Sequence, residues 1–85
     1  MAASEISDLI ARATALLNRA QRLANTAIQP SLNNQITVIA ATLRDTHVEL
    51  RRMLSGESVS RPAGPRATLD AQAAKLDALE HRLAH

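Results

Sequence analysis

The chain contains no phenylalanine, tyrosine or tryptophan, and it contains no cysteine. Without aromatic side chains it has no flat rings for stacking and none of the large anchors that dominate many protein interfaces, so any core must be aliphatic. Without cysteine it can form no disulfide, thiolate zinc site or cysteine nucleophile, and the redox compartment is left open. These absences exclude the small domains that are held together by disulfides or by cysteine-bound metal.

Long apolar runs are missing as well. The longest mainly apolar stretch, ITVIAATL at residues 36–43, is far shorter than the roughly 20 residues that cross a bilayer. The first residues, MAASEISDLI, lack the basic start and the apolar segment of a secretory signal. We therefore expect a soluble, cytoplasmic protein that has no membrane partner.

Charge is nearly balanced, because 10 basic residues stand against 8 acidic ones and give a formal net charge of +2. A surplus of two charges, interspersed along the chain, is a weak signal for nucleic-acid binding. Glycine-rich phosphate loops and nucleophile elbows are also absent. We expect no enzyme activity and no cofactor.

Two amphipathic helices are predicted on either side of Pro30. Proline removes a backbone donor and keeps Gln29 out of the helical region, while Ser31 offers a cap for a new helix. On both sides of this turn the apolar residues recur in steps of three and four, which places each set on one helical stripe. The first stripe comprises Ile6, Leu9, Ile10, Ala13, Leu16, Leu17, Ala20, Leu23, Ala24, Ala27 and Ile28, and the second comprises Leu32, Ile36, Ile39, Ala40, Leu43, Thr46, His47, Leu50, Met53 and Leu54.

Equal helix lengths about a proline turn predict an antiparallel hairpin over residues 4–54. Reflecting the chain about the proline brings the two stripes into register, with Ile28 opposite Leu32 and Ala13 opposite His47. Small residues often face larger ones in this register, which allows two helices to approach closely.

A linker and a third helix are predicted after the hairpin. Residues 55–66, SGESVSRPAGPR, hold both glycines and two of the three prolines, as flexible or extended linkers do. Residues 67–85 form an amphipathic helix that is too short to be stable alone in water. The predicted fold is all-α, an antiparallel helical hairpin plus a C-terminal amphipathic helix. It would form a three-helix bundle, or a four-helix bundle through dimerisation.

Thr46 and His47 are the polar exceptions on the second stripe. A histidine can act as a general base or a metal ligand, but it needs an oriented partner and a cleft, and Asp45 and Glu49 flank the stripe on its solvent side. We interpret Thr46 and His47 as a polar layer that sets the register of the hairpin. In the predicted register, Thr14 and Thr46 could share a hydrogen bond.

His81 and His85 lie four residues apart, a spacing that places two metal ligands on one helical face. No third ligand and no catalytic glutamate are in obvious reach, so we expect no metal site. Asp77 and Glu80 have the spacing of an ordinary solvated helix face, so we expect no acid–base pair either.

Arginines repeat on both helices of the hairpin and could line one of its edges. Such an edge can hold phosphates, which makes a small nucleic-acid-binding or regulatory helical protein the alternative interpretation. Acidic residues interleaved at positions 45 and 49 favour a solvated surface instead. The residues of this alternative are Arg12, Arg19, Arg44, Arg51 and Arg52.

The favoured interpretation is a non-enzymatic helical module for protein–protein interaction or oligomerisation, with an adaptor, chaperone-like or regulatory role. Each hairpin stripe is wider than one helix–helix contact can cover, so a further helix must bury part of it. A helical protein partner would dock by the helix-in-groove mode, and a second copy would make a dimer. The expected anchors are Leu69, Leu76, Leu79 and Leu83.

Overall fold

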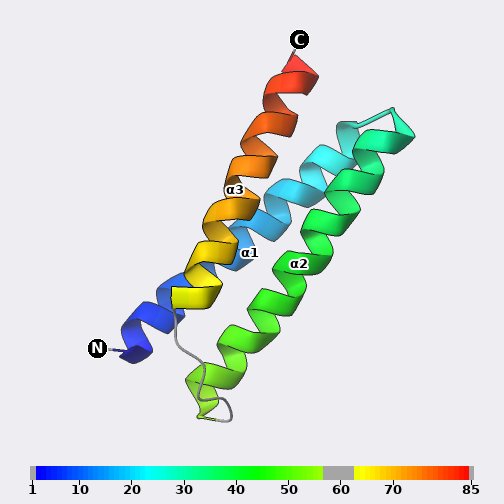
Figure 1. The fold of residues 1–85 in the computed structure, drawn as a ribbon. Coiled ribbons are helices and arrows are strands. Elements are labelled where there is room, and N and C mark those ends of the chain that lie inside the picture. The colour runs from blue at the N-terminus through cyan, green and yellow to red at the C-terminus, as the bar shows by residue number, and fades with distance from the viewer. Residues whose placement is uncertain (1, 57–62, 85) are drawn as a thin grey trace.

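Three helices pack side by side in an elongated bundle (Figure 1). The computed structural model describes residues 2–56 and 63–84, and these residues form α1 (Ala2–Thr26), α2 (Pro30–Ser55) and α3 (Ala63–Ala84), with no strand among them. The Cα atoms extend over 42 × 17 × 16 Å. The prediction of an all-α three-helix bundle is confirmed.

The connection between α1 and α2 is short and depends on Pro30. Gln29 is extended, with φ −77° and ψ 128°, and Pro30 is the first residue of α2, where a missing backbone donor costs nothing. The Asn33 side-chain amide donates to the carbonyl of Ala27 at 3.1 Å, which fastens the start of α2 to the end of α1. Ser31, expected as the cap, is instead the second residue of the helix.

One stripe on each helix builds the core. The buried residues recur at steps of three and four on all three helices, so burial of aliphatic surface joins them into one cluster. From Ala13 onward, every second buried residue of α1 and the adjoining turn is an alanine, whereas α2 and α3 contribute mostly leucine and isoleucine. The buried residues are Ile6, Leu9, Ala13, Leu16, Ala20, Leu23 and Ala27 in α1 and the adjoining turn, Leu32, Ile36, Ile39, Leu43, Thr46, Leu50 and Met53 in α2, and Leu69, Gln72, Leu76 and Leu79 in α3.

The buried residues differ from the predicted facing residues at two positions, Ile28 and His47. Matching the buried residues in order along the antiparallel helices pairs Ala27 with Leu32 and Ala13 with Thr46, where the reflection paired Ile28 and His47. Ile28 lies beyond the end of α1 and is 92% exposed. The reflection treated the turn as symmetrical about Pro30, but the proline already belongs to α2.

The third helix packs against its own hairpin and runs parallel to α1 (Figure 1). It begins at Ala63, before the predicted start at residue 67. Pro65 does not prevent this, since it falls in the first turn, where proline is tolerated. Residues 57–62 of the predicted linker lie outside the described residues. At the end of α2, Gly56 has φ +83° and donates its backbone N–H to the carbonyls of Arg52 and Met53, a C-terminal cap that suits glycine.

Candidate protein-interaction site

Charged residues of α1 and α3 meet along one side of the bundle. Arg12 Nη1 lies 2.6 Å from Asp70 Oδ1, and Arg66 pairs with Glu5 nearer the N-terminal end. Together with the contacts of Arg19, these pairs form a ladder that follows the bundle axis. We call it the ion-pair edge and define it by Glu5, Arg12, Arg19, Arg66, Asp70, Asp77 and Glu80.

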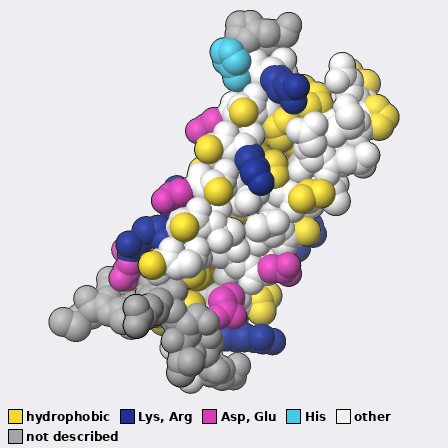
Figure 2. Space-filling model, in the orientation of Figure 1, with side chains coloured by type: hydrophobic (Ala, Val, Ile, Leu, Met, Phe, Trp, Pro, Cys, Tyr) yellow, Lys and Arg dark blue, Asp and Glu magenta, His cyan; other side chains and the backbone are white. Residues whose placement is uncertain are grey.

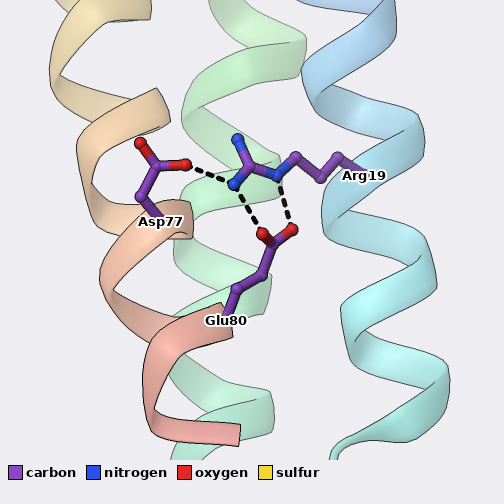
Figure 3. Close-up of polar contacts among 3 residues, drawn as sticks. All are labelled: Arg19, Asp77 and Glu80. Atoms are coloured by element: carbon purple, nitrogen blue, oxygen red, sulfur yellow. Dashed lines mark hydrogen bonds and ion pairs between the residues drawn. The ribbon is translucent and has the colours of Figure 1, made fainter. Parts of the chain in front are cut away.

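Arg19 is the centre of the ion-pair edge (Figure 3). Its Nε lies 2.5 Å from Glu80 Oε1 and its Nη2 lies 2.7 Å from Glu80 Oε2, while Nη2 also donates to Asp77. A forked contact of this kind is geometrically specific as well as charge-assisted. The hydrogen bond from Arg19 lowers the pKa of Glu80, and the bonds to Glu80 and then Asp77 raise the pKa of Arg19. The edge therefore fixes α3 against α1, with Asp77 and Glu80 both bound to Arg19.

The predicted arginine edge is not formed as one surface. Arg12 and Arg19 are paired with carboxylates of α3. Arg44 and Arg51 line hollows between α1 and α2, and Arg52 lies on the exposed surface of α2. The sequence could not show this separation, because it depends on the side of the hairpin to which α3 docks.

Thr46 and His47 have different environments. Thr46 is buried, and its hydroxyl donates to the carbonyl of Thr42 at 2.9 Å. The hydroxyl of Thr14 likewise donates within its own helix, to Ile10, so the expected bond across the hairpin is not made. His47 is half-buried beside a hollow whose lining includes no carboxylate. A role of Thr46 and His47 in setting register stays a prediction, and a catalytic base gains no support.

Metal-binding clusters and membrane-spanning helices can be checked in the described part of the chain. It holds no group of three histidine, cysteine, aspartate or glutamate residues that could bind a metal ion. His85, one of the two histidines with ligand spacing, lies outside the described residues. Within the described helices, no segment is long and apolar enough to cross a membrane.

The expected partner anchors are mostly committed to the core. Leu69, Leu76 and Leu79 are buried between α3 and the hairpin, and only Leu83 remains partly exposed, at 36%. In this arrangement α3 covers its own hairpin, and the docking of these leucines on a partner stays a prediction. Gln72 is a buried residue that was not expected from the sequence, although its position three residues after Leu69 and four before Leu76 indicates the core stripe.

An open hollow of about 540 Å³ lies at the surface between α2 and α3. It is on the opposite side of α3 from the ion-pair edge. Ile39 and Leu79 are buried at this position, and Val38 adds an apolar side chain that is 64% exposed. Lys75 and Arg82 are the charged residues of its lining, which includes no carboxylate. We call this hollow the α2/α3 groove and define it by Asn34, Gln35, Val38, Ile39, Lys75, Ala78, Leu79 and Arg82.

The space-filling view shows this face of the bundle (Figure 2). Apolar side chains are visible between α3 and α2, with basic side chains beside them on the upper part of α3. The groove was not expected from the sequence, because its residues come from helices far apart in the chain. Val38 gave the one signal, as a β-branched apolar residue next to Ile39 that lies off the buried stripe.

Comparison of the chain with protein-family models, curated proteins and solved structures finds no match. A function therefore has to be inferred from the geometry of the bundle itself.

Proposed function

We propose that the protein is a non-enzymatic helical interaction module and that its contact surface is the α2/α3 groove. The observation that carries this proposal is an open apolar groove edged by Lys75 and Arg82, with no carboxylate in its lining. The opposite side of α3 has its charges paired within the chain. The α2/α3 groove thus has the exposed apolar surface and the unbalanced charge that interaction sites use.

The side chains that line the groove indicate the class of partner that it would bind. A floor made of aliphatic side chains accepts an aliphatic ridge, and the absence of aromatic residues favours shallow helix-on-helix packing over a deep anchor pocket. The two cations favour a partner that carries carboxylates at the flanks of that ridge. We therefore propose an amphipathic, partly acidic helix as the partner, which fits an adaptor, chaperone-like or regulatory role.

Affinity capture with two charge-reversal variants tests this proposal. The groove variant is Lys75→Glu/Arg82→Glu, and the matched control is Arg44→Glu/Arg51→Glu, which makes the same charge change away from the groove. Wild-type and control proteins should retain the same partner, and the groove variant should retain about tenfold less, because two attractive contacts become repulsive. Quantitative mass spectrometry of the captured proteins is the measurement, and copies of the chain itself count as a partner.

The result that would overturn the proposal is a set of captured proteins that is identical for the wild type and the groove variant. The same control addresses the nucleic-acid alternative, which the pairing of Arg12 and Arg19 disfavours. Binding of DNA or RNA at low salt that is lost in Arg44→Glu/Arg51→Glu, with groove-dependent capture absent, would favour that alternative.

A further inference from the structure

We infer that the occupant of the α2/α3 groove is a second copy of this chain, laid antiparallel across the groove about a two-fold axis. This inference rests on the proposed function and names the partner for the same site. It comes from the order of charged and apolar residues along the face formed by α2 and α3.

Charge changes sign along this face. Lys75 and Arg82 lie on α3 toward the end of the bundle that holds the turn between α1 and α2, since they line the groove with Asn34 to Ile39. Asp45 and Glu49 follow farther along α2, toward the other end. Figure 2 shows basic side chains over the upper part of the face. Over its lower part, on the α2 side, it shows acidic side chains with a further basic one below them. Among the described residues of this face, Asp45 and Glu49 outnumber the one cation of the lower half, Arg52, so the two halves have opposite net charge and attract each other when a second copy is inverted.

The exposed valines have the spacing that such an inversion requires. Val38 and Val48 are 64% and 49% exposed, and each lies five residues from Leu43. At 1.5 Å per residue, they are about 7.5 Å to either side of the Leu43 level. A two-fold axis that crosses the face at this level brings Val38 of one copy to the axial level of Val48 of the other. The ten residues between them turn α2 by about 280°, so only Val38 lines the groove and Val48 lies on the outer flank of α2.

The same axis pairs opposite charges. Asp45 is two residues beyond Leu43, about 3 Å toward the far end of the bundle. Lys75 is the groove residue of α3 that comes closest to the Leu43 level from the other side, because α2 and α3 are antiparallel and Arg82 lies farther up. The inversion therefore brings Asp45 of one copy within reach of Lys75 of the other, and it makes this contact twice.

The size of the face suits a dimer. Its Cα dimensions of 42 × 17 Å correspond to a projected area of about 700 Å², before side chains are added. Stable protein interfaces bury roughly 800 Å² per partner. An isolated short peptide would cover only the groove, whereas a second copy covers the groove together with the part of α2 that carries Asp45 and Glu49.

One contact of the proposed dimer is unfavourable and supplies a test. Arg52 lies nine residues beyond Leu43, about 13.5 Å along the axis, so the inversion brings it to the level of Arg82 of the other copy. Both side chains are exposed, which moderates the repulsion. Replacing Arg52→Glu should strengthen self-association by about threefold, because two repulsive contacts become attractive.

Sedimentation equilibrium with complementary charge variants is the main experiment. Lys75→Glu and Asp45→Lys, each alone, should weaken self-association about tenfold, because each places like charges at both contacts. An equimolar mixture of the two variants should recover the wild-type affinity, since position 75 of each chain then meets an opposite charge at position 45 of the other. Arg44→Glu, on the hollow between α1 and α2, is the charge-matched control and should leave self-association unchanged.

Cysteine trapping tests the direction of the two copies. The natural chain has no cysteine, so an introduced thiol has no competitor. Val38→Cys mixed with Val48→Cys should be joined efficiently by a flexible thiol-reactive cross-linker of about 10 Å, and each variant alone should be joined less, because identical positions lie about 15 Å apart along the axis. Efficient trapping of either variant alone, with none in the mixture, would contradict the antiparallel arrangement.

The outcomes separate this inference from the proposed function. A wild-type chain that stays monomeric up to about 500 µM overturns the second-copy inference, as does a mixture of charge variants that associates no better than its components. Groove-dependent capture of a different protein under those conditions would still support the interaction module. Loss of both self-association and groove-dependent capture would reject both proposals.

Discussion

On its α1 side, α3 presents Asp70, Asp77 and Glu80, and on its α2 side it presents Lys75 and Arg82. The acids are met by arginines of α1, whereas the groove residues of α2 include no acid to meet the cations. One helix thus has its charges paired on one side and unbalanced on the other. Charge thus holds α3 against α1 along one edge, whereas the lining of the α2/α3 groove holds two cations and no carboxylate, which is why we propose it as the contact surface.

The largest expected effect comes from a substitution in the core between the two edges of α3. Leu76 is fully buried, and Leu76→Ala should lower the free energy of unfolding by about 3 kcal/mol, through lost apolar burial and the cavity left behind. Urea titration followed by far-ultraviolet circular dichroism measures it, since the chain has no tryptophan. Leu83→Ala, at a partly exposed position, should cost less than about 1 kcal/mol. Equal losses at the two positions would contradict the docking of α3.

A pair of matched substitutions compares the two edges directly. Arg19→Met breaks the forked contact with Glu80 and should lower the free energy of unfolding by about 1 kcal/mol. Lys75→Met, on the groove side, should change it by less than about 0.5 kcal/mol at concentrations where the chain is monomeric. The same urea titration measures both. An equal decrease in the free energy of unfolding for Lys75→Met and Arg19→Met would show that ion pairs within the chain also stabilise the groove side of α3.

The smallest expected effect is the pH dependence of the ion-pair edge. Because Arg19 lowers the pKa of Glu80 in the folded state, the unfolded chain binds the proton more readily. The stabilisation is therefore complete above the ordinary pKa of 4.5 and is lost as the pH falls through the lowered value. Glu80→Gln should reduce this acid-dependent loss by less than about 1 kcal/mol, since the contact is partly exposed. Asp8→Asn, an exposed acid of α1, is the control, and an equal effect there would refute the assignment.

The helices and most of their buried stripe could be predicted from the sequence, because a helix that buries one side repeats its apolar residues every three or four positions. The end of the first stripe could not, since Ile28 and Ala27 are both apolar and only the start of α2 at Pro30 decides which of them is buried. Likewise, the sequence placed both Thr46 and His47 on the stripe and did not indicate that Thr46 is buried while His47 is only half-buried.

The candidate site was less accessible to prediction than the fold. Arg12 and Arg19 look like solvated residues of a hairpin until the carboxylates of α3 are placed beside them. The α2/α3 groove joins Val38 to Ala78, and no spacing within either helix shows that they are neighbours. Sequence periodicity indicates which side of a helix is buried, but it does not indicate which helix lies against which flank.

The buried alanines of α1 limit the distance between the helices. Ala13 and Ala20 have no exposed surface, so single methyl groups decide how near α2 and α3 come to the axis of α1. A larger side chain at either position would push the helices apart. The ion pairs of Arg12 and Arg19 with the carboxylates of α3 would then lengthen or break. Close packing at Ala13 and Ala20 is thus a condition for the salt contacts on the surface of the bundle.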